Sequence, residues 1–219
     1  MDRAMMYDVI VIGGGPAGMM AAIAAAENGA RVCLLEPNER LGKKLNITGK
    51  GRCNVTNNCS AAELQGKVLC NGKFLYSAFS RYDPSDVMRF FEDHGVPLKT
   101  ERGNRVFPVS DRSFDISAAL EKYLRALSVD LVRDRAEALL IENGALRGVV
   151  CTHGRREAPR VIVATGGLSY PTTGSTGDGY RFAKECGHAV TEQYPSLVPF
   201  NAKEAFVKEL QGLSLRNVR

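Results

Sequence analysis

The sequence has no hydrophobic run long enough to cross a bilayer and no pattern typical of a leader peptide. The longest apolar stretch near its start, residues 9–12, is followed at once by glycines, whereas a membrane-spanning helix needs about 20 apolar residues. No lysine-led region precedes that stretch, as one would in a secretory signal. We therefore expect a cytoplasmic protein that does not bind a membrane.

The cysteine and histidine patterns of metal and catalytic sites are also missing. None of the six cysteines has the paired CxxC spacing of a zinc site, and they are too sparse for a disulfide-stapled small domain. The three histidines fall beside glycines or at a predicted helix end, without a nucleophile or ligand partner at a recognisable spacing. We expect reduced thiols and no metal site, and we assign no catalytic residue. The residues concerned are Cys33, Cys53, Cys59, Cys70, Cys151, Cys186, His94, His153 and His188.

The composition is that of a globular protein, with 44% hydrophobic and 24% charged residues in 219, which excludes disorder and fibres. The length suits one large domain, or a domain and a fragment of a second. The net charge of +5 is mild, but five cations gather in residues 40–52 beside the single acid Glu39. This cluster predicts either an anionic ligand or a solvated loop. It contains no aromatic residue on which bases could stack, so we expect no nucleic acid partner.

The first 36 residues have the pattern of a βαβ unit. Residues 7–12 form a β-branched run that predicts a buried strand, and Pro16 stands where a helix can begin without its N–H. Good helix formers continue to Gly29, which predicts the helix end, and residues 31–36 predict a second buried strand. A right-handed crossover makes these two strands parallel. The expected fold class is therefore α/β.

A glycine fingerprint occupies the turn between the first strand and the helix. Gly13, Gly15 and Gly18 form GxGxxG, in which the glycines permit a tight turn, close approach of a pyrophosphate, and close packing of helix on strand. Glu36 follows Gly18 by 18 residues, at the end of the second strand, where it would accept hydrogen bonds from an adenosine ribose. Its charge would repel a 2′-phosphate. The pattern predicts a dinucleotide other than NADP.

The long segment of residues 37–60 distinguishes this sequence from that of a plain NAD dehydrogenase. A dehydrogenase would continue into another helix and strand, but residues 42–57 are rich in glycine and hydrogen-bond donors. Backbone amides of Gly49 and Gly51 and the side chains of Arg52 and Asn54 could hold a cofactor longer than an adenosine half. We therefore expect FAD.

The remainder predicts further regular elements from Asp83 onward. Two helices are expected, one from Asp83 to a stop at Gly95 and one carrying the apolar stripe of residues 116–127. Residues 131–160 predict an antiparallel hairpin or three-stranded meander, and residues 160–164 a buried strand that ends in Thr165, Gly166 and Gly167. A last helix, residues 180–186, follows a Gly-Asp-Gly turn that would place N–H groups near an anion.

The tail differs in character from the rest. Residues 195–219 hold a short apolar run and a polar, helix-like segment. We expect a FAD-binding domain in residues 1–194 and the start of a second, truncated domain in residues 195–219, which the family resemblance described next identifies as an inserted domain. The chain is thus expected to be an N-terminal portion of a longer protein, without the segment that completes its sheet.

Three segments carry a family resemblance: YDVIVIGGGPAGMMAA, LGKKLNITGKGRCNVTN and VIVATGGLSYPTTGSTGDGY. Together they resemble the bacterial FAD-binding oxidoreductases labelled aminoacetone oxidase-like or dehydro-bile-acid reductase-like, among the two-dinucleotide-binding-domain flavoproteins. The resemblance implies a three-layer Rossmann-like FAD/NAD(P)-binding domain with an antiparallel β-meander crossover. It also implies an inserted domain and a C-terminal segment that contacts the cofactor.

The same resemblance implies roles for individual residues. The fingerprint would hold the pyrophosphate, Glu36 the adenosine ribose, and Ala136 the adenine. A loop on the flavin side would include Lys44 and the GRCN string, and the segment after the last strand would pass near the cofactor. The expected cofactor-binding residues are Gly13, Gly15, Pro16, Ala17, Gly18, Glu36, Lys44, Gly51, Arg52, Cys53, Asn54, Ala136, Thr165, Gly166 and Gly167.

The leading hypothesis is a FAD-dependent oxidoreductase in which the flavin transfers electrons or hydride to or from a small molecule. One alternative is a flavin disulfide reductase using Cys53 and Cys59, although five residues separate them where those enzymes have four. Another is a non-catalytic dinucleotide-binding module. NADH and NADPH are candidate redox partners, and the sequence leaves the substrate and the oligomeric state open.

Overall fold

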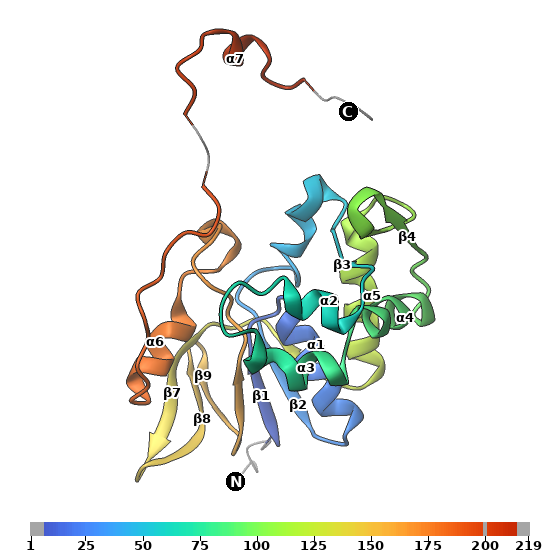
Figure 1. The fold of residues 1–219 in the computed structure, drawn as a ribbon. Coiled ribbons are helices and arrows are strands. Elements are labelled where there is room, and N and C mark those ends of the chain that lie inside the picture. Colours follow the sequence, from blue (N-terminus) through green and yellow to red (C-terminus); the bar gives the residue numbers. More distant parts are fainter. Residues whose placement is uncertain (1–6, 199–200, 214–219) are drawn as a thin grey trace. The chain divides into compact units, whose positions relative to one another are not determined.

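The computed structural model describes residues 7–198 and 201–213, which fall into two compact units, one up to His188 and one from Ala189 (Figure 1). The first unit contains a four-stranded parallel sheet with the strand order β10-β1-β2-β6. Helix α1 connects β1 to β2, which confirms the predicted βαβ unit. The bounds are β1 (Val9–Ile12), α1 (Pro16–Glu27), β2 (Val32–Leu35), β6 (Asp130–Val132) and β10 (Val161–Val163).

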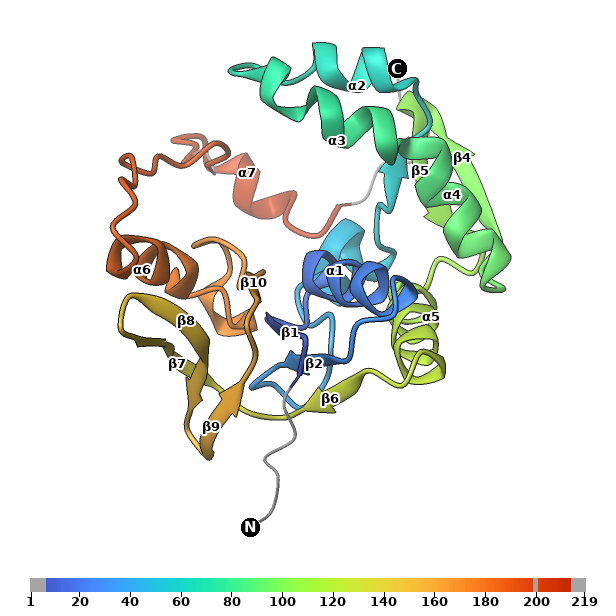
Figure 2. The same cartoon turned by 90° about the horizontal axis from the view of Figure 1, so that it is seen from below.

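The two faces of this sheet form two separate cores, because side chains alternate along a strand. Val11 and Leu34 face one way and pack against α1 and α5 (Ser113–Ala126). Ile10 and Leu35 face the other way and pack against residues of the antiparallel meander. Figure 2 shows helices on one side of the sheet and the meander on the other. The first unit therefore has three layers, and the predicted Rossmann-like fold class is confirmed.

The meander is a three-stranded antiparallel sheet in which β8 lies between β7 and β9. Asn143 and Gly144 both have positive φ in the first turn, as the Asn-Gly pair predicts. The meander begins later than predicted, because residues 131 and 132 belong to β6 and pair with β2. The bounds are β7 (Ala136–Glu142), β8 (Ala145–Cys151) and β9 (Gly154–Glu157).

The prediction that regular structure resumes only at Asp83 is wrong. A short helix, α2, begins after Ser60, whose side chain accepts from the N–H of Glu63 while the Glu63 carboxylate accepts from the N–H of Ser60. None of the residues in α2 or the two elements after it is buried, so no apolar periodicity indicates them. The elements before Asp83 are η1 (Leu45–Gly51), β3 (Thr56–Asn57), α2 (Ala61–Gly66), η2 (Gly72–Leu75) and α3 (Tyr76–Arg81).

Both predicted helices after Asp83 are present. Asp83 caps α4 (Pro84–Asp93) in a capping box with Asp86, and α5 carries the predicted apolar stripe. Between them lies a hairpin that was not predicted, which forms a second antiparallel sheet in the order β3-β5-β4. Its parts are β4 (Leu98–Glu101), η3 (Arg102–Asn104) and β5 (Arg105–Pro108).

The last elements of the first unit are η4 (Pro171–Thr173) and α6 (Asp178–Glu185), and the second unit contains α7 (Phe206–Glu209). The predicted domain boundary after residue 194 lies close to the division at His188. Residues 199, 200 and 214–219 of the predicted inserted segment lie outside the described residues, and its assignment stays a prediction. No helix in residues 7–198 or 201–213 is long and apolar enough to cross a membrane.

Candidate cofactor-binding site

A cleft of about 500 Å³ opens at the carboxyl ends of β1, β2 and β10. Strand β1 has the next strand of the chain, β2, on one side and the late strand β10 on the other, so the strand order reverses at β1. Open α/β sheets bind their ligands at such a switch point. The lining comprises residues 12–17, 35–38, 43, 44, 134–136, 164–166, 171–176 and 178.

The requirement for glycine differs among the three positions of the fingerprint. Gly13 has φ +109° and a Cβ there would lie 2.5 Å from the Ala164 carbonyl oxygen, so the turn itself requires glycine. A Cβ on Gly18 would lie 1.8 Å from the Gly13 carbonyl oxygen, so helix α1 could not pack as it does. A Cβ on Gly15 would meet no atom within 4 Å, and Gly15 lines the cleft at the start of α1. No contact among residues 7–198 and 201–213 explains this third glycine, whereas a phosphate at the helix N-terminus would.

Glu36 lies half-buried at the end of β2, in contact with the fingerprint. Its Oε2 accepts from the N–H of Gly14 at 2.8 Å, and its Oε1 accepts from the N–H and side-chain Nδ2 of Asn38 at 2.9 and 2.7 Å. A carboxylate offers about four acceptor positions, so these three donors leave capacity for a further one. The carboxylate is thus oriented with room for one further hydrogen bond, and its predicted contact with a ribose hydroxyl stays a prediction.

Lys43 and Lys44 contribute two ammonium groups to the cleft lining. Lys43 Nζ donates to the Thr172 carbonyl oxygen at 2.8 Å, and Lys44 Nζ donates to Ser175 Oγ at 2.6 Å. These partners are neutral, and neither lysine forms an ion pair with another residue in the described part of the chain. The cleft lining therefore carries two ammonium groups without an ion-pair partner, and an anionic dinucleotide fits this donor set.

The opposite wall of the cleft comes from the crossing between β6 and β7. Asp134, Arg135 and Ala136 line it, and Arg135 Nη2 lies 3.0 Å from Oδ2 of Asp178 at the start of α6. The acid at that helix start is thus ion-paired within the chain, and the expected anion site there stays a prediction. Ala136 lines the cleft, and its predicted contact with the adenine stays a prediction.

The segment after β10 follows the predicted path only in part. Thr165 and Gly166 line the cleft, and Gly167 does not. Gly166 has φ +76°, and a Cβ there would lie 2.7 Å from Ser175 Oγ. The close approach of these two segments, strengthened by the Lys44 contact with Ser175, places the Gly/Ser/Thr-rich loop along the cleft.

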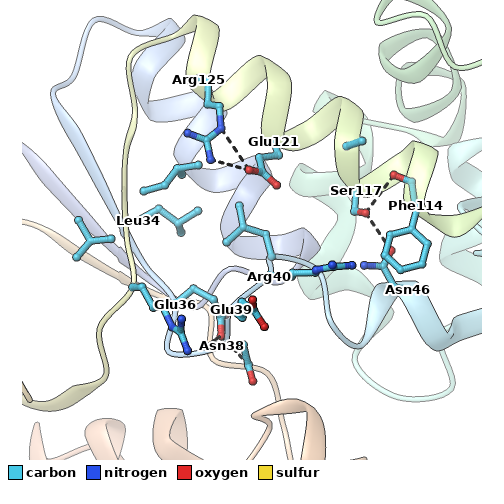
Figure 3. A pocket seen from close by; sticks show the side chains of 15 residues that line it. Leu34, Glu36, Asn38, Glu39, Arg40, Asn46, Phe114, Ser117, Glu121 and Arg125 are labelled. Atoms are coloured by element: carbon cyan, nitrogen blue, oxygen red, sulfur yellow. Dashed lines mark hydrogen bonds and ion pairs between the residues drawn. The ribbon is translucent and has the colours of Figure 1, made fainter.

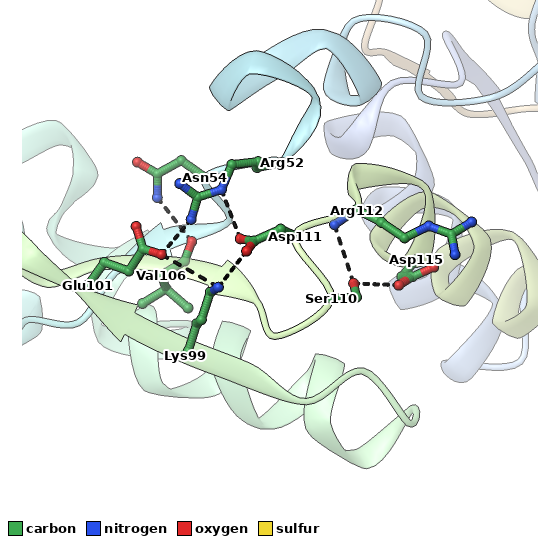
Figure 4. Close-up of polar contacts among 9 residues, drawn as sticks. All are labelled: Arg52, Asn54, Lys99, Glu101, Val106, Ser110, Asp111, Arg112 and Asp115. Carbon is green, nitrogen blue, oxygen red and sulfur yellow. Dashed lines mark hydrogen bonds and ion pairs between the residues drawn. The ribbon is translucent and has the colours of Figure 1, made fainter. Parts of the chain in front are cut away.

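Arg52 does not line the cleft; its side chain is held in an ion-pair network (Figure 4). The guanidinium contacts Glu101 Oε1 at 2.5 Å and Asp111 Oδ1 at 2.8 Å, and lies 4.1 Å from the centroid of the Phe107 ring. Lys99 Nζ contacts the second Asp111 oxygen at 2.7 Å. The hydrogen bond to Glu101 is the main cause of a raised Arg52 pKa. This network attaches the GRCN string to the β4–β5 hairpin.

The neighbours of Arg52 are likewise absent from the cleft lining. Asn54 Nδ2 donates to the carbonyl oxygens of Thr56 and Val106, at 2.8 and 3.1 Å, and so stabilises the loop itself. Gly51 has φ +84° and Cys53 φ +59°, which shows a sharply turning backbone. The structure thus brings Lys44 to the cleft but not the GRCN string, whose flavin-side role stays a prediction.

Of the two thiols in the disulfide-reductase alternative, Cys53 does not have reactive surroundings. Cys53 and Cys59 are both free, and Cys53 is 4% exposed. Burial raises the pKa of the Cys53 thiol, whereas reactive cysteines have a lowered pKa. Across the described residues, no group of three or more His, Cys, Asp or Glu side chains could hold a metal ion.

A second hollow of about 380 Å³ lies on the α5 side of Glu36 (Figure 3). Glu36 and Asn38 line both hollows. Glu36 is the one predicted site residue that lines the second hollow, among the residues that the structure describes. Arg125 and Glu121 form an ion pair at 2.7 Å along its α5 wall. The dinucleotide prediction therefore applies to the cleft at the fingerprint.

Sequence reasoning missed five residues that shape the cleft. Asn38 and Lys43 lie in the basic loop, and Ser175 and Asp178 lie in the Gly/Ser/Thr-rich stretch, so composition indicated their neighbourhoods but not their contacts. Asp134 follows a strand in an ordinary polar context, and no sequence signal identified it.

Comparisons with known proteins place the chain. It is 36% identical over 203 residues to the 3-dehydro-bile acid delta(4,6)-reductase of Clostridium scindens, covering 91% of this chain and 48% of that protein. It is 28% identical over 216 residues to the ribosomal RNA dihydrouridine synthase of Escherichia coli, covering 95% and 51%. The chain thus spans about half the length of these curated relatives.

The similarity to solved structures concerns the fold. The Mycobacterium smegmatis Sdh1 complex matches with a TM-score of 0.63 and 24% identity, covering 83% of this chain and 39% of that one. The 3-ketosteroid-delta4-(5alpha)-dehydrogenase from Rhodococcus jostii matches with a TM-score of 0.61 and 18% identity, covering 75% and 47%.

A family model described as the HI0933-like protein Rossmann domain matches residues 7–214. This match and the bile-acid reductase relative confirm the resemblance found in the sequence, and they support FAD as the cofactor. The chain belongs to the HI0933-like Rossmann domain family of FAD-binding oxidoreductases.

Proposed function

We propose that this chain supplies the FAD site of an oxidoreductase that reduces a carbon–carbon double bond in a small organic substrate. The observation that carries the FAD site is the cleft at the N-terminus of α1. There an unexplained glycine leaves open space, two lysines lack acidic partners, and Glu36 keeps an acceptor free. Gly15 and both lysines would hold the pyrophosphate, Glu36 the ribose, and the Ala136 side of the cleft the adenine.

The substrate class is supported by the two relatives together. A delta(4,6)-reductase and a dihydrouridine synthase both, by their names, produce a saturated carbon–carbon bond from an unsaturated one. In such a reaction the reduced flavin supplies a hydride to one carbon and a proton is added to the other, which leaves oxidised FAD. We propose NADH or NADPH as the reductant that restores the reduced flavin. A steroid-like enone is the first candidate because the bile-acid relative has the higher identity.

A uracil base in RNA is the second candidate, on the strength of the dihydrouridine synthase relative. The predicted absence of a nucleic acid partner therefore stays a prediction. The experiment is anaerobic photoreduction of the FAD-loaded protein, followed by mixing with a steroid dienone or with a uridine-containing oligoribonucleotide. Reoxidation of the flavin spectrum, with a product two hydrogens heavier, identifies the substrate class. A protein that takes up no FAD, or reduced flavin that neither compound reoxidises faster than buffer, would contradict the proposal.

A further inference from the structure

Asp134 is a buried carboxylate that no catalytic or cofactor role explains. It is 3% exposed and lies in the crossing from β6 to β7, where it lines the cleft together with Arg135 and Ala136. Ionised carboxylates are rarely buried unless they are paired and hydrogen-bonded. The partners of Asp134 therefore indicate what its burial achieves.

The carboxylate joins three segments of the chain. Its Oδ1 accepts from the N–H of Arg135 at 2.9 Å and from the N–H of His153 at 3.3 Å, and lies 3.0 Å from His153 Nδ1. Its Oδ2 accepts from Nη2 of Arg156 in β9 at 3.2 Å. The turn between β8 and β9 is thereby attached to the crossing. A backbone hydrogen bond from Thr152 N–H to the Arg135 carbonyl oxygen, at 3.0 Å, reinforces the attachment.

The attachment continues across the cleft wall. Arg135, whose backbone Asp134 holds, forms an ion pair with Asp178 at 3.0 Å, and Thr176 Oγ1 donates to the same carboxylate oxygen at 2.9 Å. Both Thr176 and Asp178 line the cleft. A continuous set of contacts therefore runs from the meander through Asp134 and Arg135 to the Gly/Ser/Thr-rich loop.

We propose that Asp134 is a positioning residue that fixes the Arg135–Ala136 backbone as the wall against which the adenosine half of the cofactor binds. This inference rests on the proposed FAD site. Asp134 itself is directed to the meander, so it acts through the backbone it holds. Its loss releases the wall of the cleft without removing a cofactor ligand. The consequence is selective, since ligands that carry adenosine lose affinity and FMN, which lacks it, does not.

The test compares Asp134→Asn and Asp134→Ala with Glu137→Gln as the control. Glu137 lies in the same strand as Ala136, is exposed, accepts from Thr152 Oγ1, and does not line the cleft. Affinities for FAD, ADP and FMN are measured by calorimetry. Hydrogen exchange of the backbone amides is followed in the cofactor-free chain.

We expect Asp134→Ala to bind FAD and ADP about tenfold more weakly than the parent chain, the scale of one lost charge-assisted hydrogen bond. Asp134→Asn keeps an acceptor for the backbone N–H groups, so its affinities for FAD and ADP should lie between those of the parent chain and of Asp134→Ala. FMN affinity and the control are unchanged, and amide exchange accelerates most strongly in residues 133–136 and 152–156, beyond the general increase that a lower unfolding free energy produces.

Two results would overturn the proposal. Equal ADP affinity in parent and Asp134→Ala would show that the wall does not depend on this carboxylate. Equal loss for ADP and FMN, with exchange accelerated to the same degree in the sheet as in residues 133–136 and 152–156, would show a merely structural role. A parent chain that binds neither FAD nor ADP would instead refute the proposed function, and the exchange pattern would still decide whether Asp134 fixes the wall.

Discussion

Glu36 combines a free acceptor position with a fixed orientation, and both depend on its charge. We predict that Glu36→Gln weakens FAD binding by about 1–2 kcal/mol, since a charge-assisted hydrogen bond to a ribose hydroxyl becomes a neutral one. Glu39→Gln is the matched control, because Glu39 is exposed and does not line the cleft. Calorimetric titration with FAD gives both values. Equal affinities in the two variants would place the ribose elsewhere.

Arg52 belongs to the GRCN string predicted on the flavin side, but its side chain contacts acids outside the cleft. Its ion pairs with Glu101 and Asp111 predict that Arg52→Ala lowers the free energy of unfolding by about 1 kcal/mol, because the network is only partly exposed. The loss should diminish at high salt, which screens such pairs. Arg147→Ala, an exposed cation on β8, is the control. Urea unfolding at two salt concentrations measures the effect, and unchanged stability in Arg52→Ala would contradict the network's structural role.

Asp134 also predicts a pH dependence of stability. Burial opposes its ionisation, but hydrogen bonds from His153 and from the backbone N–H groups of Arg135 and His153 outweigh it, so the pKa of Asp134 is lowered. A lowered folded-state pKa contributes stability above the unfolded-state pKa of about 3.9, and this contribution is lost as the pH falls further.

We therefore predict that Asp134→Asn costs about 2 kcal/mol of unfolding free energy at pH 7. The difference from the parent chain should shrink as the pH falls from about 5 toward 2. Urea unfolding across this pH range measures it, with Glu137→Gln as the control. A difference that stays constant with pH would show that the Asp134 charge is not the stabilising feature.

At the scale of elements, the fingerprint turn separates folding from binding. Gly15→Ala places its Cβ in open space at an ordinary φ of −75°, so we predict stability within about 0.5 kcal/mol of the parent and weaker FAD binding. Gly18→Ala would place a Cβ against the Gly13 carbonyl oxygen, so we predict a loss of more than about 3 kcal/mol. Thermal unfolding and FAD titration measure both, and undiminished FAD affinity in Gly15→Ala would contradict the helix-terminus site.

Elements with a long or regular buried stripe could be predicted from the sequence, whereas the exposed helices and the short β4–β5 hairpin could not. Strands β1 and β2 are wholly buried, and α5 buries a regular stripe, so hydrophobic patterns identified them. Helices α2 and α3 bury nothing, and Phe74 and Tyr76 nearby are 87% and 65% exposed. The capping pair Ser60 and Glu63 was a usable signal for α2 that composition alone obscured.

In the cleft, sequence reasoning identified the local motifs but not the long-range contacts. The fingerprint and Glu36 are local motifs whose spacing determines their geometry, and Gly13, Gly15 and Glu36 line the cleft, although Gly18 does not. Arg52 was a candidate because of its neighbours in sequence, but its ion-pair partners lie 49 and 59 residues away along the chain. Asp134 depends on contacts with the β8–β9 turn, 19 to 22 residues away. Long-range partners of this kind have no local sequence signal.

At the scale of the whole molecule, the sheet, both cores and the cleft lie in the unit that ends at His188. Every described residue from 191 to 213 is exposed. We predict that a chain ending at His188 has the thermal midpoint and the FAD affinity of residues 1–219. Scanning calorimetry and FAD titration of both lengths test this. A markedly lower midpoint in the shorter chain would show that residues 189–219 stabilise the first unit.

The central claim is that the cleft at the α1 N-terminus holds FAD through its adenosine diphosphate half. The most direct measurement is an equilibrium FAD titration, with ADP as competitor, of the parent chain and two double variants. Lys43→Gln/Lys44→Gln removes the two lysine charges of the cleft. Lys67→Gln/Lys73→Gln removes two lysine charges from exposed positions elsewhere. We predict saturable FAD binding that ADP displaces, at least about tenfold weaker in the cleft variant and unchanged in the other. Equal FAD affinity in both double variants, or displacement of FAD by FMN but not by ADP, would contradict the account.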